Sequence, residues 1–318
     1  MFLHDQAHFA EVVRRVGDDL KRDVAMVEKD YWLTHSLASL ADQGFEIWFK
    51  GGTSLSKGLQ LTERFSEDLD LRLDAGRVAD LREPTRSWKS ESSSAIAERS
   101  QWFDDLAVRI QIPGCTLRRN PLGSDASQRS AWFEVQYPSL TGAMFSAQFR
   151  PFVLLEVGRA RVVPCVPQPI RSWVADWVQF HAPSELPSVP TASAIQCIHP
   201  WVTAIEKIDA VCRRFHRNEV QAADFVRHYE DLAAIFRQTE RIPKLDQSFI
   251  ALAQELLEAR DIRRLPDPND SAFHPTASET WNSIRTAWAA HRHAFWGPRI
   301  SLEDACATVR AFLREQGF

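Results

Sequence analysis

The sequence predicts an α+β protein in which a sheet-bearing first half precedes a mainly helical second half. Short runs of β-forming residues, such as "FEIWF" (45–49) and "FVLLEVG" (152–158), supply strands up to about residue 158. After residue 200 the apolar residues recur at three- and four-residue spacing, which is typical of helices. Four prolines fall within residues 181–200. We therefore expect two domains, 1–180 and 181–318.

Composition narrows the class of protein. A length of 318 residues is enough for two domains and for an enzyme, and the net charge of −4 gives no global basic footprint, so contact with nucleic acid would need a local patch. The five cysteines are scattered and form no CxxC pair, which argues against a disulfide or zinc framework. The N-terminus lacks the pattern of a signal peptide, and no apolar stretch is long enough to span a bilayer. We expect a cytoplasmic protein that does not enter a membrane.

The elements of the first half follow from periodicity and from turn residues. Helical spacing between Asp5 and Gln43 predicts two helices, and a glycine turn after the strand at 45–49 opens another helix at "GGTSLSKGLQL" (51–61). "EDLDLRL" (67–73) alternates as a half-buried strand does. A serine-rich loop that becomes helical is expected over 82–101. Further strands are expected at 106–112, 131–137, 145–150 and 152–158.

Three helices are expected in the second half. Pro200 is well placed as a first helical residue, and the apolar residues that follow share one helical face. The second helix is predicted over Glu219–Gln238 and the third over Leu302–Glu315. The proline-rich segment before them either links the domains or folds over the site.

The pair Asp68 and Asp70 is the first candidate for chemistry. Residues i and i+2 of a strand point to the same side, so these carboxylates share a face with Ser66, whereas Leu69 and Leu71 face the core. Two adjacent carboxylates repel each other unless a cation lies between them, and Mg²⁺ accepts carboxylate, phosphate and water oxygens together. Asp68 and Asp70 are therefore candidate metal ligands.

The preceding turn suits a phosphate group. Gly51 and Gly52 let backbone N–H groups approach an anion, and the side chains of Thr53, Ser54 and Lys57 could add donors. The motif is not a Walker A loop, because "GGTSLSKG" lacks the order GxxxxGK[ST]. A glycine turn before a DxD strand resembles the nucleotidyltransferases of the DNA polymerase β type, and a triphosphate would suit both halves of the motif.

Five segments together resemble one family. They are "VEKDYWLTHSLASL" (27–40), "FKGGTSLSKGLQLTERFSEDLDL" (49–71), "LLEVG" (154–158), "AIEKIDAV" (204–211) and "RHYEDLAAI" (227–235). In this order they look like the AbiEii/AbiGii nucleotidyltransferases, the toxins of type IV toxin–antitoxin and abortive-infection systems. The resemblance covers about 27–237. It implies a polymerase β-like domain with a mixed sheet, a helical C-terminal domain, Mg²⁺, an NTP substrate, an RNA acceptor such as a tRNA 3′ end, and a cognate antitoxin.

The resemblance also assigns roles. It places Gly52 and Thr53 in the phosphate-binding turn, and Asp68 and Asp70 in the metal pair. Lys207 and Asp231 match its two helical motifs and are candidate catalytic residues, although Lys207 could instead be a surface lysine. Glu156 is the candidate third metal ligand, because it interrupts an apolar strand where an unpaired charge is costly. Its competitor, Glu134, is interpreted as an exposed strand residue.

Two further predictions concern regulation and the acceptor. Phosphorylation of Ser66 would add negative charge beside the metal ligands and oppose NTP binding, so an inactive Ser66→Glu with an active Ser66→Ala would support it. Arg213, Arg214 and Arg217 are candidate RNA contacts, although such a run also suits the C-terminal turn of a helix.

Two alternatives to RNA modification stay open. The acceptor could be a hydroxyl of a protein or of a small molecule, because the motifs do not encode the acceptor surface. The chain could also bind a nucleotide or a partner without catalysis. The intact pair Asp68 and Asp70 argues against that second alternative.

Overall fold

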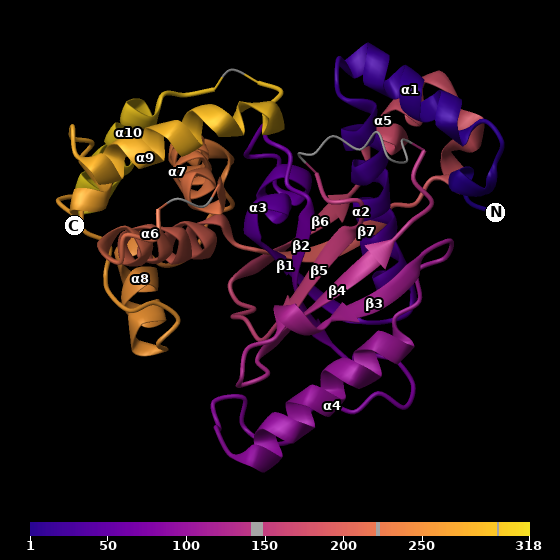
Figure 1. The fold of residues 1–318 in the computed structure, drawn as a ribbon, viewed down its shortest axis with the longest axis horizontal. Helices are drawn as coiled ribbons and strands as arrows, with labels where there is room; N and C mark the ends of the chain where they lie inside the picture. Colours follow the sequence, from indigo (N-terminus) through magenta and orange to yellow (C-terminus); the bar gives the residue numbers. More distant parts are fainter. Residues whose placement is uncertain (141–148, 221–222, 298) are drawn as a thin grey trace. The chain divides into compact units, whose positions relative to one another are not determined.

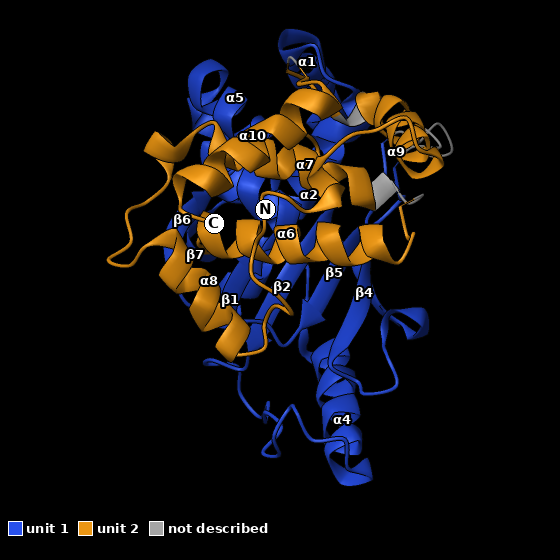
Figure 2. Ribbon diagram, turned by 90° about the vertical axis from the view of Figure 1, so that its left-hand side faces the viewer, with its two compact units in different colours: residues 1–58, 67–197 blue, residues 59–66, 198–318 orange. Residues whose placement is uncertain are grey.

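The computed structural model describes residues 1–140, 149–220, 223–297 and 299–318, which form two compact units (Figures 1 and 2). Unit 1 contains residues 1–58 and 67–197, and unit 2 contains residues 59–66 and 198–318. The chain therefore leaves unit 1 just before the DxD strand and returns to it at Glu67. The expected domains, 1–180 and 181–318, stay a prediction, and residues 181–197 belong to unit 1 by their contacts.

Unit 1 is built on a mixed sheet. Its described part has seven strands in the order β3-β4-β5-β2-β1-β7-β6. The strands are β1 (Glu46–Lys50), β2 (Asp68–Asp74), β3 (Thr116–Asn120), β4 (Ser130–Gln136), β5 (Val153–Gly158), β6 (Cys165–Ile170) and β7 (Ala192–Ile198). The strand β2 runs antiparallel to β1 and parallel to β5, whereas β1 runs parallel to β7. The expected α+β class with a mixed sheet is confirmed.

Helices cover this sheet. The two helices expected before the first strand are α1 (Phe9–Leu20) and α2 (Val24–Asp42), and α5 (Trp173–His181) packs against both of them. Because α2 also contacts β1 and β5, it is buried on nearly every side, including polar residues such as Lys29 and Asp30. A helix enclosed in this way presents side chains from all its faces to the interior.

The strand expected at 106–112 is wrong. Helix α4 (Ser93–Arg109) continues through most of it, and Ser92 begins the helix by accepting a hydrogen bond from the Ala95 backbone N–H. Trp102, Phe103 and Leu106 are buried at helical spacing. The alternation in "LAVRIQI" suggested a strand, but the apolar residues just before it fit a helical face, and that longer pattern decides the structure.

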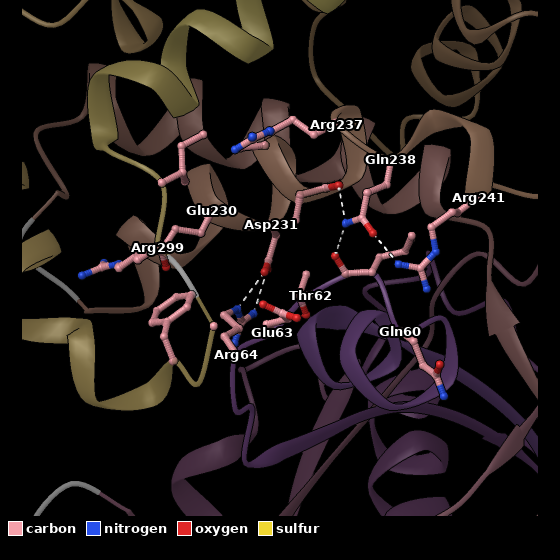
Figure 3. A pocket seen from close by; sticks show the side chains of 16 residues that line it. Gln60, Thr62, Glu63, Arg64, Glu230, Asp231, Arg237, Gln238, Arg241 and Arg299 are labelled. Carbon is pink, nitrogen blue, oxygen red and sulfur yellow. Dashed lines mark hydrogen bonds and ion pairs between the residues drawn. The ribbon is translucent and has the colours of Figure 1, made fainter. Parts of the chain in front are cut away.

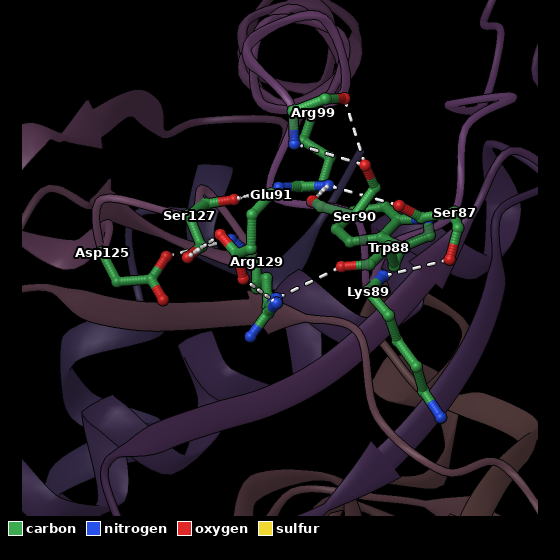
Figure 4. Close-up of polar contacts among 10 residues, drawn as sticks. Ser87, Trp88, Lys89, Ser90, Glu91, Arg99, Asp125, Ser127 and Arg129 are labelled. Atoms are coloured by element: carbon green, nitrogen blue, oxygen red, sulfur yellow. Dashed lines mark hydrogen bonds and ion pairs between the residues drawn. The ribbon is translucent and has the colours of Figure 1, made fainter.

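The serine-rich loop before α4 is fixed by two arginines (Figure 4). Arg99 is fully buried, and its guanidinium donates to the carbonyl oxygens of Ser127, at 2.6 and 2.9 Å, and of Ser90, at 3.0 Å. Arg129 donates to the Trp88 carbonyl oxygen at 3.2 Å and pairs with Glu91. Backbone carbonyls thus satisfy a buried cation and hold the loop on its helix.

The proline-rich segment contains a strand that the sequence did not indicate. Within residues 181–200, β7 pairs with β1, with Gln196 opposite Trp48 and Cys197 opposite Phe49. The segment is therefore part of the sheet of unit 1. The strand expected at 145–150 falls mostly outside the described residues.

Unit 2 is helical. Its helices are α6 (Pro200–His216), α7 (Ala223–Phe236), α8 (Phe249–Glu258), α9 (Glu279–Ala290) and α10 (Leu302–Glu315). The three expected helices are present as α6, α7 and α10, and α7 contacts α6, α9 and α10. Phe236 on α7 stacks on Phe312 of α10, with ring centroids 4.0 Å apart. In the described part of the chain, no helix is both long enough and apolar enough to cross a bilayer.

Candidate active site

The carboxylates Asp68 and Asp70 lie where β2 begins, in the middle of the sheet. Asp70 is opposite Lys50 on β1 and opposite Glu156 on β5. Leu69 and Leu71 point to the other side and are fully buried, as the alternation predicted. Adjacent strands are about 5 Å apart, so this register places Asp70 and Glu156 side by side.

Glu156 experiences both burial and negative charge. Burial raises the pKa of its carboxyl group, and the charges of Asp70 and Asp68 raise it further, to about 8. A side-chain hydrogen bond with Asp70 acts in the same direction. Three carboxyl groups so close together need a shared proton or a cation.

The glycine turn packs directly on Asp70. Gly51 has φ +75°, and a Cβ atom there would lie 1.8 Å from Asp70 Oδ2, so only glycine fits. The hydroxyl of the buried Thr53 donates to the Asp68 backbone carbonyl oxygen. Because of these two contacts, the turn and the carboxylate strand form one local structure.

The helix expected after the turn is short. It consists of α3 (Gly51–Thr53) and a π-helical segment, Ser54–Gly58. Ser54 is buried beside Cys197, and the Lys57 ammonium pairs with Asp30 and donates to the Arg171 carbonyl oxygen at 3.1 Å. Lys57 therefore has structural partners here, whereas Ser54 Oγ is buried without a hydrogen-bond partner among the described residues. The predicted contact of both side chains with phosphate stays a prediction.

Sequence reasoning missed a cation at this site. Arg150 Nη1 lies 2.6 Å from Asp68 Oδ1, and about 40% of its side chain is exposed. The Arg150 backbone is fixed because its N–H donates to Glu67 at 2.8 Å and its carbonyl oxygen accepts from the buried Lys29 at 2.7 Å. Lys29 lies in the "VEKDYWL" motif, so the sequence pointed to the residue that supports Arg150. Arg150 itself lies in none of the motifs.

The donor set suits a hard divalent cation. Asp68, Asp70 and Glu156 offer only oxygen atoms, and their mutual repulsion is what such a cation relieves. Within the described residues, no set of three or more His, Cys, Asp or Glu side chains is arranged to hold a metal ion. Mg²⁺ commonly takes one or two carboxylates and completes its shell with water and substrate phosphate.

Two expectations about neighbouring residues need correction. Glu134 is buried rather than exposed, and it pairs with Arg118 at 2.7 Å and accepts from Asn120 at 2.8 Å. Ser66 precedes β2, belongs to unit 2 and is only 8% exposed, so it lies outside the strand whose alternation suggested a face shared with Asp68 and Asp70. Its phosphorylation stays a prediction without that geometric basis.

In unit 2 the two predicted helical residues meet. Lys207 on α6 lies 2.9 Å from Asp231 Oδ2 on α7, and its ammonium is 3.2 Å from His228 Nδ1. Arg64 donates two hydrogen bonds to the same carboxylate, of 2.7 and 2.8 Å. Lys207 is buried, so it is not a surface lysine. Sequence reasoning missed Arg64, although it lies within the quoted motif "ERFSEDLDL".

Electrostatics fix the charge states in this cluster. Burial opposes ionisation of Asp231, but Arg64 and Lys207 outweigh it and hold the pKa of the carboxyl group below its usual value. Burial, followed by the charge of Lys207, lowers the pKa of His228 well below its usual value. Asp231 is therefore an anion between two cations, and His228 is neutral near pH 7.

Two of the three arginines at the end of α6 have partners within unit 2. Arg213 lies 3.6 Å from Asp209, and the Arg214 guanidinium is 5.5 Å from the centre of the Phe225 ring. Arg217 follows the helix and is exposed. Their predicted contact with RNA stays a prediction.

A comparison with protein families identifies the chain. The model of the family described as "Nucleotidyl transferase AbiEii toxin, Type IV TA system" matches residues 33–305. The chain belongs to the AbiEii family. It is thus a nucleotidyltransferase of a type IV toxin–antitoxin system, as the sequence resemblance predicted, and membership implies a nucleotide substrate and a cognate antitoxin. The AbiEii match extends past residue 237, where the sequence motifs ended. Neither a curated protein nor a solved structure matches this AbiEii chain.

Proposed function

We propose that this protein transfers a nucleoside monophosphate from an NTP to an RNA acceptor, such as a tRNA 3′ end, and releases pyrophosphate. The observation that carries the proposal is the grouping of Asp68, Asp70 and Glu156 on adjacent strands beside the turn at Gly51. Carboxylates can hold the metal ion of a metal-bound triphosphate, and a glycine turn beside them lets the backbone approach its phosphates.

Asp68 and Asp70 would hold Mg²⁺, with Glu156 as a third ligand. Bound there, Mg²⁺ would neutralise phosphate charge and lower the pKa of the attacking hydroxyl. Glu156 must give up its proton before it can contribute a carboxylate, because its pKa is raised to about 8. Asp68 must exchange its contact with Arg150, which frees the guanidinium for a phosphate oxygen.

The other candidate residues have distinct roles. The backbone of Gly51, Gly52 and Thr53 would approach the phosphates, because the turn has no bulky side chain there. In unit 2, the Asp231 carboxylate contacts the Lys207 ammonium and orients it, so Asp231 is a positioning residue for that ammonium. Lys207 matches a helical motif of the AbiEii family, and on that ground we expect Lys207→Met to lower nucleotidyl transfer.

The decisive experiment supplies the full-length protein with each α-³²P-labelled NTP, Mg²⁺ and total bacterial tRNA. We expect label on RNA with one preferred NTP. Asp68→Asn/Asp70→Asn should reduce labelling by more than about 100-fold, because several kcal/mol of transition-state stabilisation depends on the metal. The matched control is Asp104→Asn/Asp105→Asn on α4, which should keep full activity.

The same experiment separates the alternatives. Label on the protein itself would favour a protein hydroxyl as acceptor. Binding of NTP with no labelled product would favour a non-catalytic nucleotide-binding protein. Equal labelling by the wild type and by Asp68→Asn/Asp70→Asn would refute the assignment of the metal ligands.

A further inference from the structure

A cavity of about 410 Å³ lies wholly within unit 2 (Figure 3). It is lined by the segment 60–64, by α7 and the turn after it, and by Phe295, Gly297, Arg299 and Ile300. We call it the α7 pocket. Its volume is within the range of small-molecule sites. None of its lining residues belongs to the carboxylate group of unit 1, and Lys207 does not line it.

Backbone pairing shapes one wall of the α7 pocket. Arg64 and Phe295 form an isolated antiparallel bridge, and the Trp296 N–H donates to the Glu63 carbonyl oxygen at 3.2 Å. A Cβ atom on Gly297 would lie 1.7 Å from Glu63 Oε2, so a larger residue there would displace the Glu63 carboxylate. The wall is therefore built by specific contacts between two distant parts of the chain.

Some buried polar atoms of residues that line the α7 pocket have no partner among the described residues. They are Thr62 Oγ1, Glu230 Oε2 and Arg299 Nη2. Thr62 and Glu230 are only 7% and 5% exposed, and both line the pocket. An unpaired buried polar atom is unfavourable, so a ligand that pairs with these atoms is favoured on binding.

The rim of the α7 pocket is cationic. Arg64 and Arg299 are neutralised by Asp231 and Glu230, respectively. The exposed Arg237 and Arg241 have no carboxylate partner among the described residues, and Arg241 donates only to the amide oxygen of Gln238. Two unneutralised guanidinium groups favour an anion, and phosphate suits their geometry.

We propose that the α7 pocket binds one nucleoside monophosphate unit, either free or at the end of an RNA strand. Arg237 and Arg241 hold the phosphate. At the inner end of the pocket, a hydrogen-bond donor of the sugar or base pairs with Glu230 Oε2. An acceptor of the sugar or base pairs with Arg299 Nη2. Phe295 contributes an aromatic ring beside the base. The inference does not depend on the transfer reaction.

The test is calorimetric titration of the full-length protein with AMP, GMP, CMP and UMP in EDTA. Inorganic phosphate and an RNA trinucleotide with a 3′ hydroxyl are titrated separately. We expect at least one monophosphate to bind at one site, and to bind more tightly than inorganic phosphate. Tighter binding of the trinucleotide, in competition with the monophosphate, would assign the site to an RNA end. Binding of the monophosphate alone would assign it to a free nucleotide.

Variants locate the site. Arg237→Glu and Arg241→Glu should each weaken binding at least about tenfold, because each removes a charge-assisted hydrogen bond. Thr62→Val should weaken it by about threefold or more. Arg314→Glu, on the exposed face of α10, and Asp68→Ala/Asp70→Ala should leave the dissociation constant within about twofold. If Arg237→Glu does not fold, Arg237→Gln replaces it.

Three results would overturn the proposal. The first is no binding of any monophosphate or of the trinucleotide. The second is inorganic phosphate binding as tightly as the monophosphates. The third is binding that Asp68→Ala/Asp70→Ala abolishes and Arg237→Glu leaves intact. Because the titration contains neither metal nor triphosphate, loss of nucleotidyl transfer would not produce any of these three results.

Discussion

A single carboxylate, Asp231, compensates two buried cations in unit 2. It is fully buried between Arg64 and Lys207. We expect Asp231→Asn to lower the free energy of unfolding by about 3–5 kcal/mol, because it removes the buried carboxylate charge that both cations contact. Urea denaturation monitored by tryptophan fluorescence measures this. The exposed Asp246→Asn should change stability by less than about 0.5 kcal/mol, and equal effects of the two substitutions would contradict the prediction.

Substitution of Gly51 tests whether activity needs the contact between the glycine turn and Asp70. Gly51→Ala adds the strain of a positive φ, about 1–2 kcal/mol, and also collides with the carboxylate. Gly317→Ala is the control, since it has φ +88° but its Cβ atom meets nothing closer than 3.5 Å. We expect nucleotidyl transfer to fall sharply only in Gly51→Ala. Similar activity in both variants would show that this contact is not needed.

At the residue scale, sequence spacing predicted the position of a functional side chain only where that side chain lies within a regular strand pattern. The shared face of Asp68 and Asp70 follows from the period of a strand, and the structure places them so. Arg64 and Arg150 could not be assigned, because their partners Asp231 and Asp68 are 167 and 82 residues away. A long-range ion pair leaves no periodic signal in a single sequence.

The strand β7 is the element that the sequence concealed. It lies between β1 and β6, so both of its edges are paired. We expect Gln196→Pro to destabilise unit 1 by about 3 kcal/mol or more, because proline removes an N–H from an interior strand. Gln196→Ala keeps that N–H and should cost about 1 kcal/mol or less. Thermal unfolding of both variants tests this, and equal midpoints would exclude β7 as a structural strand.

At the element scale, prediction succeeded for helices and failed where tertiary contacts chose the structure. Long amphipathic periods identified α6 and α10, and α10 has the predicted bounds. By contrast, β7 sits among prolines, and only pairing with β1 makes it a strand. Propensity is a weak guide to short strands, because burial and cross-strand neighbours decide them.

At the scale of the whole molecule, buried titratable groups set the dependence of stability on pH. Burial lowers the pKa of four histidines. As the pH falls below about 6.5, these histidines therefore bind protons in the unfolded chain more readily than in the folded chain. Burial also raises the pKa of two glutamates, which bind protons in the folded chain and partly offset this. These groups are His4, His35, His199, His228, Glu156 and Glu230.

Without metal, the four histidines outweigh the two glutamates between pH 6 and pH 5. The unfolded chain then binds more protons than the folded chain, so stability should fall as the pH falls through this range. Urea denaturation in EDTA at several pH values measures the slope. His199→Asn keeps a helix-capping side chain and should flatten the slope, because it removes one buried histidine whose pKa is lowered by burial. An unchanged slope in that variant would contradict the assignment.

The sequence by itself determined the family, the α+β class, the three helices of the second half and the carboxylate pair. These depend on short spacings and on the periods of strands and helices, which a chain carries locally. Only the tertiary structure decided that Glu156 lies beside Asp70, that Arg64 and Lys207 share Asp231, and that an arginine-rimmed pocket forms beside α7. Each of these needs residues that are distant in sequence to meet, and the packing of the whole unit provides that.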